Sequence, residues 1–528
     1  MTSSRIARST KHLCTLFVAA VVCPVLTVFA QPAESVKPAS SGDSLKALRA
    51  DLHDRIKEPQ FAAAMWGVKV VSLDTGKMLF EHNAGKLFSP ASNSKLYTCA
   101  LALDRLGPDY CIKTSLYARA RPDRRGTLNG DLIVHGRGDP TLNARLHSGD
   151  LFRALDPLVA ALTNAGVKRI KGDLIGDESF FRGPPCGSGW AWDDLEYDYG
   201  AEISALTLND NLLELNVKPG RQVGSPCRLL LHPATAYVTL SNQTLTVASG
   251  ARRRISLYRP PGASVTYVRG QMPMEDSGSG EAVTVHNPAG LFVAFFKEAL
   301  ARHGIKVSGR LRTVNWLARE TAPLDLAGAV ELGAVESLPL RDIVREIQKP
   351  SQNLYADLLL AHVGAVVQAT NTSAARLTSE AAGIAELNRF LSETGIEEGS
   401  VFFEEGSGLS RNNLTTASAT VRLLEFMSRH PWAEVYREAL PIAGVDGTLK
   451  GRMKGTAAAG NVSAKTGTLR WANSLSGYVT TAAGERLIFS LMLNRYHNPD
   501  PGRSGRAALD ALAVRLAGFA GHSSMAGN

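Results

Sequence analysis

The sequence predicts a mixed α/β protein of the α+β type, in which one domain is assembled from two separated stretches of chain around a β-rich insertion. Helix and strand patterns alternate over residues 44–110 and return over residues 306–528. Short strand patterns separated by turn-rich joints dominate residues 111–305. A chain of 528 residues is also longer than one ordinary core, so we expect more than one domain.

The first stretch begins with a helix and a hairpin. A helical pattern covers residues 44–56, and strand-like residues 67–73 and 78–81 flank a turn. A second helical pattern opens at Pro90, with apolar residues every three or four positions. Ser92 therefore lies at the start of a helix.

The insertion is expected to hold one or two β-rich domains, after which helices return and the chain closes with a hairpin and a helix. Strands are predicted at 132–134, 213–217, 228–231, 265–268, 475–479 and 487–493, and helices at 291–303, 338–346, 353–367 and 507–519.

The first thirty residues are typical of an export signal, and residues 31–43 of a flexible leader. A basic start precedes an apolar run over 13–30, and residues 28–30 place small side chains where signal cleavage requires them. An uncleaved membrane anchor is the alternative, although Pro24 within the run favours a signal. No other segment has the length and apolar content of a bilayer span. We therefore expect an exported, periplasmic protein with at most peripheral membrane association.

Composition excludes several classes of function. The formal net charge is +9, but no run of Lys and Arg is interleaved with aromatic residues, so nucleic-acid binding is not expected. The mild positive charge suits an acidic polymer such as cell-wall material, without requiring one. The 12 histidines are scattered, with no H-E-x-x-H or comparable spacing, so we expect neither a metal site nor a cofactor.

Four cysteines remain beyond the signal: Cys99, Cys111, Cys186 and Cys227. An exported protein can oxidise such residues, and Cys186 with Cys227 is the preferred pair. None has C-x-x-C or His-paired spacing, which argues against a zinc site and against a thiol nucleophile.

The only S-x-x-K in the chain is Ser92-Asn93-Ser94-Lys95, at the predicted helix start. Residues three apart share one face of a helix, so Ser92 and Lys95 are expected to be neighbours. A serine hydroxyl is a poor nucleophile until a base takes its proton, and lysine is such a base only when its amine is neutral. Burial and a second nearby cation favour the neutral amine, and Lys465 is the candidate for that cation.

A single K-T-G motif, Lys465-Thr466-Gly467, lies far downstream in a strand-like segment that continues into Thr468. Such a strand beside a cleft can pair with an extended substrate, and Lys465 and Thr466 offer donors to a terminal carboxylate. Gly467 is expected to let the substrate approach closely. The backbone N–H groups of Ser92 and Thr468 would meet an oxyanion.

Two S-x-N sequences lie between these motifs, Ser351-Gln352-Asn353 and Ser410-Arg411-Asn412. We choose the first, because it opens an amphipathic helix that would hold both side chains at its start. The second follows a Gly-Ser-Gly loop, where a turn role is sufficient. Ser351 would then relay a proton to the leaving amine, and Asn353 would hold the substrate amide.

In their order and settings these motifs resemble the D-alanyl-D-alanine carboxypeptidase/endopeptidase family, the class C low-molecular-mass penicillin-binding proteins. The stretch between Ser92 and Ser351 is far longer than in class A β-lactamases, and this family carries large domains inserted there. The similarity covers about residues 45–520. Further segments that look like family signatures are Gly138-Asp139-Pro140-Thr141, Gly189-Trp190-Ala191-Trp192-Asp193-Asp194, Glu405-Gly406-Ser407-Gly408-Leu409-Ser410 and Leu440-Pro441-Ile442-Ala443-Gly444-Val445-Asp446-Gly447-Thr448-Leu449.

The resemblance implies a serine β-lactamase/DD-peptidase-like catalytic domain in an exported serine D-Ala-D-Ala carboxypeptidase that is also a DD-endopeptidase. Ser92 would form an acyl-enzyme with peptidoglycan stem peptides, and β-lactams would acylate the same serine and leave slowly. The family also places an acidic residue from an inserted domain near the free amino group of the substrate. Asp194 matches that residue best, with Asp193 adjacent. Gln352 stands where Asp is often seen, and no chemistry is expected of it.

Two alternatives remain open at this point. A β-lactamase would need fast deacylation, and no glutamate of the class A type is apparent by motif. A catalytically inert cell-wall-binding protein on the same fold is opposed by the intact motifs. The sequence predicts no oligomeric state.

Overall fold

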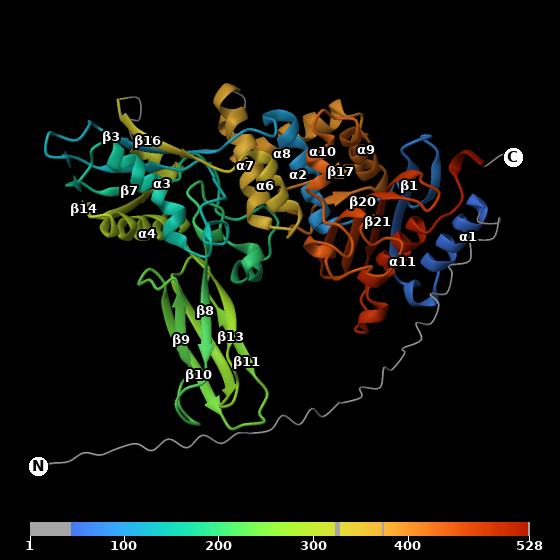
Figure 1. The fold of residues 1–528 in the computed structure, drawn as a ribbon, viewed down its shortest axis with the longest axis horizontal. Coiled ribbons are helices and arrows are strands. Elements are labelled where there is room, and N and C mark those ends of the chain that lie inside the picture. Colours follow the sequence, from blue (N-terminus) through green and yellow to red (C-terminus); the bar gives the residue numbers. More distant parts are fainter. Residues whose placement is uncertain (1–43, 323–327, 372–373, 526–528) are drawn as a thin grey trace, which may run out of the picture. The chain divides into compact units, whose positions relative to one another are not determined.

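The computed structural model describes residues 44–322, 328–371 and 374–525 (Figure 1). The expected export signal and leader, residues 1–43, lie outside the described residues. Within the part of the chain that the structure describes, no helix is long and apolar enough to cross a membrane.

One five-stranded antiparallel sheet joins the two ends of the described chain, in the order β19-β20-β21-β1-β2. Alternate residues of its strands face opposite sides, as the pleat requires. Leu487, Phe489 and Leu491 pack with α1 and α11, whereas Ile488 packs with the helices of the other face. The bounds are β1 Met65–Ser72, β2 Met78–His82, β19 Ser463–Leu469, β20 Ala472–Thr480, β21 Arg486–Asn494, α1 Leu45–Ile56 and α11 Gly505–Ala517.

A cluster of helices packs against the other face of this sheet and buries the motif-bearing segments (Figure 1). Helix α2 contacts α7, and α7 is buried continuously from Asn353 to Ala365. Polar side chains on these two helices therefore lie inside the protein rather than at its surface. The bounds are α2 Ser94–Leu106, α6 Leu340–Gln348, α7 Asn353–Thr370, α8 Ser379–Glu393, α9 Ala417–Ser428 and α10 Ala433–Glu438, with a short hairpin of β17 Val401–Phe402 and β18 Leu414–Thr415 beside them.

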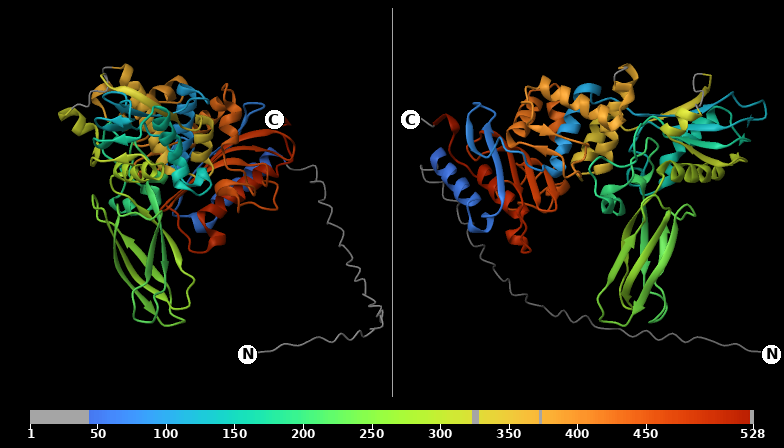
Figure 2. Two further views of the ribbon diagram at one scale, coloured as in Figure 1. Left: turned by 60° about the vertical axis from the view of Figure 1, so that its left-hand side comes forward. Right: turned by 180° about the vertical axis from the view of Figure 1, so that it is seen from behind.

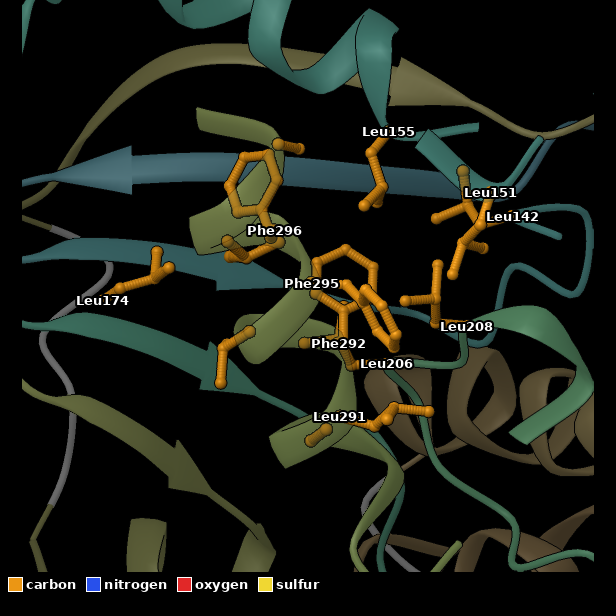
Figure 3. Packing of buried hydrophobic residues seen from close by; sticks show 14 of the residues in the cluster. Leu142, Leu151, Leu155, Leu174, Leu206, Leu208, Leu291, Phe292, Phe295 and Phe296 are labelled. Atoms are coloured by element: carbon orange, nitrogen blue, oxygen red, sulfur yellow. The ribbon is translucent and has the colours of Figure 1, made fainter. Parts of the chain in front are cut away.

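The insertion contains a second five-stranded sheet of mixed direction, in the order β15-β7-β5-β3-β16. Phe292, Phe295 and Phe296 of α4 pack with Leu151 and Leu155 of α3 in its core (Figure 3). The bounds are β3 Lys113–Ala118, β5 Leu132–His135, β7 Leu174–Asp177, β15 Leu311–Val314, β16 Val330–Glu336, α3 Leu151–Asn164, α4 Pro288–Arg302 and α5 Trp316–Thr321, with a small sheet of β4 Thr127–Leu128, β6 Arg169–Ile170 and β14 Lys306–Val307.

Two features of this part differ from the sequence prediction. Helix α3 was not predicted, although Asp150 caps it and its apolar residues recur at helical spacing. Strands β15 and β16 complete the inserted sheet, so its pairing continues past residue 305, where we expected the first domain to resume. Pairing between strands far apart in sequence leaves no local signal.

Residues 212–284 form two three-stranded sheets, β13-β8-β9 and β10-β12-β11 (Figure 2). Buried residues of both sheets, including Leu215 and Val268, belong to one apolar cluster, as in a sandwich. The bounds are β8 Leu212–Lys218, β9 Arg228–His232, β10 Thr239–Val247, β11 Arg254–Tyr258, β12 Val265–Pro273 and β13 Ser279–Thr284.

The preferred disulfide is wrong. Cys186 and Cys227 are both free thiols in the structure, as are Cys99 and Cys111 among the described residues. Cys227 is buried in the apolar cluster of the insertion, where a thiol packs as a small apolar side chain.

Candidate active site

Ser92 lies in a short 3-10 turn, Ala91–Asn93, that leads directly into α2. Ala91 and Asn93 are buried, whereas Ser92 is partly exposed. Ala91 has a φ of 49°, a left-handed conformation that alanine rarely adopts and that the surrounding structure must stabilise. Asn93 Nδ2 donates to Ser476 Oγ at 2.8 Å and so ties the turn to β20. The serine hydroxyl is therefore presented from a turn that is anchored to the sheet.

Lys95 is completely buried directly beside that serine. Its Nζ lies 3.0 Å from Ser92 Oγ, 2.6 Å from Asn353 Oδ1 and 2.6 Å from the carbonyl oxygen of Ser407. Burial lowers the pKa of Lys95 to about 8, although the neighbouring carboxyl groups of Asp357 and Glu405 oppose the shift. As a neutral amine, Lys95 would donate to Asn353 and Ser407 and accept the proton of Ser92, which is the geometry that a general base requires.

The second lysine meets the S-x-N motif. Lys465 Nζ donates to Ser351 Oγ at 2.8 Å and to the carbonyl oxygen of Thr466 at 2.9 Å. Burial, followed by the positive charge of Lys95, holds the pKa of Lys465 well below its ordinary value. Ser351 has a φ of 69°, a strained conformation immediately before α7 that turns its hydroxyl toward the lysine.

Asn353 and Gln352 have different tasks at the start of α7. Asn353 Oδ1 accepts from Lys95, and its Nδ2 donates to the carbonyl oxygen of Tyr199 at 3.0 Å. Gln352, of which no chemistry was expected, caps the helix by accepting from the N–H of Leu354 at 3.1 Å. The middle position of the motif therefore has a structural role.

The rejected S-x-N sequence lies elsewhere in the hydrogen-bond network. Ser410 Oγ and Asn412 Nδ2 both donate to the carboxylate of Glu404, at 3.0 and 2.9 Å. These contacts stabilise the loop itself. The structure brings together the first S-x-N, the S-x-x-K and the K-T-G.

The K-T-G segment forms β19, the edge strand of the sheet. Thr468 is exposed, whereas Thr466 is buried with its Oγ1 2.7 Å from Thr448 Oγ1. Gly467 also has a structural task that was not expected. A Cβ there would lie 2.5 Å from the carbonyl oxygen of Pro90 and closer still to Ser474 Oγ. The glycine therefore lets β19 approach the turn that carries Ser92.

Asp194 lies in a short 3-10 helix, Trp192–Glu196, of the insertion. Its Oδ2 accepts from the N–H of Ala191 at 2.9 Å, which is a local capping contact. Burial raises the pKa of Asp194, and the nearby charges of Arg411 and Arg470 partly offset the rise. The adjacent Asp193 is exposed. The chain that follows this helix contacts the site, because the carbonyl oxygen of Tyr199 accepts a hydrogen bond from Asn353 Nδ2.

Sequence reasoning missed two buried carboxyl groups and a carbonyl that surround Lys95. Ser407 supplies the carbonyl, and the carboxyl groups belong to Asp357 and Glu405, which are 3% and 0% exposed. A signal was present, because Asp357 is one helical turn after Asn353 and a buried helix rarely carries an unpaired carboxyl. Among the described residues, no group of three or more His, Cys, Asp or Glu side chains is arranged to hold a metal ion.

Comparison with known proteins supports one family over nearly the whole chain. The model of the D-Ala-D-Ala carboxypeptidase 3 (S13) family matches residues 48–516. The D-alanyl-D-alanine carboxypeptidase of Actinomadura sp. (strain R39) is 35% identical over 520 residues, which cover 96% of this chain and 91% of that protein. The D-alanyl-D-alanine carboxypeptidase DacB of Haemophilus influenzae is 28% identical over 442 residues, which cover 81% of this chain and 85% of that protein.

The fold is also similar to a solved structure. The crystal structure of penicillin binding protein 4 (dacB) from Haemophilus influenzae superimposes with a TM-score of 0.75 at 25% identity, covering 88% of this chain and 98% of that one. The predicted fold class is confirmed, and the similarity includes the insertion.

Proposed function

Because the chain belongs to the D-Ala-D-Ala carboxypeptidase 3 (S13) family and is a D-Ala-D-Ala carboxypeptidase, we propose that it works through an acyl-enzyme on Ser92. The substrate would be the stem peptide of peptidoglycan, reached after export through the N-terminal signal. The observation that carries the proposal is the 3.0 Å contact between Ser92 Oγ and the buried amine of Lys95, whose pKa is lowered to about 8.

Acylation begins when Lys95 takes the hydroxyl proton of Ser92 and Oγ attacks the carbonyl between the two D-alanines. The backbone N–H groups of Ser92 and Thr468 stabilise the oxyanion. The substrate carboxylate meets Lys465, Thr466 and Thr468, and its negative charge favours the protonated form of Lys465.

The leaving D-alanine then receives a proton from Ser351, whose hydroxyl is replenished from Lys465 through their 2.8 Å hydrogen bond. In deacylation the same path runs in reverse. Water attacks the ester and gives its proton through Ser351 to Lys465, while Lys95 returns its proton to Ser92 Oγ. Protons balance over the cycle, and the free enzyme is restored.

Two further activities follow from this site. Cleavage of a cross-link between stem peptides needs only a larger leaving group on the same carbonyl, so we include DD-endopeptidase activity. A β-lactam presents a strained amide to the same serine, and the name of the penicillin binding protein with the similar structure supports acylation by such compounds. Asp194 or the exposed Asp193 would face the amino group of the stem peptide.

The test is intact-mass analysis of the purified mature protein after incubation with a penicillin, beside Ser92→Ala. We expect one stable adduct on the wild type and none on Ser92→Ala, with matched thermal unfolding to show that the variant is folded. An adduct that persists in Ser92→Ala would refute the assignment. Rapid turnover of penicillin without an adduct would instead indicate a β-lactamase, and no reaction at all would indicate an inert wall-binding protein.

A further inference from the structure

The Glu405 carboxylate lies at the centre of its own loop, with no solvent exposure. It accepts from the N–H of Ser407 at 3.0 Å, from the N–H of Gly408 at 2.7 Å and from Asn413 Nδ2 at 2.7 Å, and it also receives a short hydrogen bond from Ser407 Oγ. Donors on both oxygens satisfy an ionised carboxylate. The loop is therefore folded around one buried negative charge.

That loop places a carbonyl group on Lys95, and its backbone packs against the turn that carries Ser92. The carbonyl oxygen of Ser407 accepts from Lys95 Nζ at 2.6 Å. Gly408 has a φ of 86° and packs so closely that a Cβ there would collide with the carbonyl oxygen of Ala91. The carboxylate of Glu405 thus sets the position of two groups that hold the Ser92–Lys95 pair.

Asp357 reaches the same loop from α7. Its Oδ1 accepts from the N–H of Gly406 at 3.0 Å, whereas its Oδ2 meets no N–H or hydroxyl donor among the described residues. The Glu405 carboxyl lies beside it, and two adjacent buried carboxyl groups cannot both be ionised. Burial, followed by the charge of Glu405, raises the pKa of Asp357 well above its ordinary value, although Lys95 opposes the shift. Asp357 therefore keeps its proton and Glu405 keeps the charge.

We propose that Glu405 and Asp357 are positioning residues that share one negative charge and one proton behind Lys95. Glu405 directs the Ser407 carbonyl onto Lys95. The proton on Asp357 leaves only one negative charge beside the lysine to oppose the lowering of its pKa. This inference rests on the proposed role of Lys95 as the base that activates Ser92.

The electrostatic consequence is that Lys95 can lose its proton near neutral pH. In the part of the chain that the structure describes, the titratable groups that face Lys95 are Cys99 from its own helix, Asp357 from α7, Glu405 from the loop and Lys465 from β19. Asp357 itself faces Glu405, Lys95 and Glu380. A second negative charge would favour the ammonium form of Lys95 and leave less free base for catalysis.

The experiment is the pH dependence of Ser92 acylation by a fluorescent penicillin between about pH 5 and pH 10, in four proteins. Wild type should lose rate as the pH falls below about 8. In Glu405→Gln this acid limb should move down by about one pH unit or more, because a negative charge is removed, and the plateau rate should fall about tenfold or more. Glu398→Gln, which removes the charge of an exposed glutamate seven residues earlier in the chain, should match wild type.

Asp357→Asn provides the sharp discrimination. An Asn amide can accept from Gly406 and donate toward Glu405, as the protonated acid does, so its acid limb should coincide with that of wild type. If the limb of Asp357→Asn moves as far as that of Glu405→Gln, Asp357 is ionised in the working enzyme and the inference is wrong. Infrared difference spectra at pH 8 should show a protonated carboxyl in wild type that disappears in Asp357→Asn.

Two controls separate this inference from other failures. Glu405→Asp keeps the negative charge, but its shorter side chain cannot make the same hydrogen bonds to the loop. Its acid limb should therefore stay at the wild-type pH while its plateau rate falls. This variant also tests the inference if Glu405→Gln does not fold. A folded Glu405→Gln with an unshifted acid limb would show that the carboxylate is only structural. If wild type is not acylated at all, the proposed function fails, whatever the infrared spectra show for Asp357.

Discussion

Gly467→Ala tests whether β19 must approach the nucleophile's turn as closely as the structure shows. The new Cβ would lie 2.5 Å from the carbonyl oxygen of Pro90, a backbone atom, and closer still to Ser474 Oγ. Ser474 Oγ also donates to that carbonyl at 2.6 Å, so the clash falls on the contact that holds the turn. Side chains can rotate away from such a contact, but the Pro90 carbonyl moves only with the turn.

The expected magnitude follows from this geometry. Overpacking by one methyl group costs about 1–3 kcal/mol of unfolding free energy. Displacing the turn by about 1 Å would lower the rate of Ser92 acylation by about 100-fold, since reacting groups tolerate little misplacement. The double variant Gly467→Ala/Ser474→Ala removes the side-chain clash only, so acylation should stay impaired.

The assay is the rate of adduct formation with a fluorescent penicillin, alongside urea unfolding of each variant. Gly451→Ala is the matched control, because a Cβ at that glycine meets no atom within 4 Å and its φ is not left-handed. It should match wild type in both measurements. Acylation of Gly467→Ala at the wild-type rate would refute the claim that this contact positions Ser92.

Three further outcomes are expected. Ser351→Ala should lower kcat for D-Ala-D-Ala peptide cleavage by about 100-fold or more, in the range of general acid–base effects, whereas Ser410→Ala in the other S-x-N should stay within about threefold; equal losses would contradict the choice of motif. The pKa of Lys95 is lowered to about 8 in the folded protein, so between pH 8 and its unfolded pKa of 10.5 the unfolded chain binds more protons. The unfolding free energy of wild type relative to Lys95→Met should therefore rise with pH across that window, by up to about 3 kcal/mol, and a flat difference in urea unfolding would contradict the shift. Thiol titration of the denatured mature protein without reductant should find four free thiols, because Cys99, Cys111, Cys186 and Cys227 are unpaired, and two would restore the expected disulfide.

Features that depend on local periodicity were predictable from the sequence. The β1–β2 hairpin, α7 and the closing helix α11 lie within a few residues of their predicted ranges, because apolar spacing and turn residues act over short distances. Lys95 was expected beside Ser92 for the same reason, since three residues along a helix bring both to one face.

Features that depend on burial and on contacts between distant segments were decided by the tertiary structure. The lowered pKa of Lys95 results from its desolvation between α2 and α7, and its partners Asn353 and Ser407 come from segments far along the chain. Asp357 and Glu405 carried no motif that marked them as a pair. A side chain's sequence neighbours say how it is spaced, but the dielectric around it and the charges facing it are set only when helices and loops from the whole chain pack together.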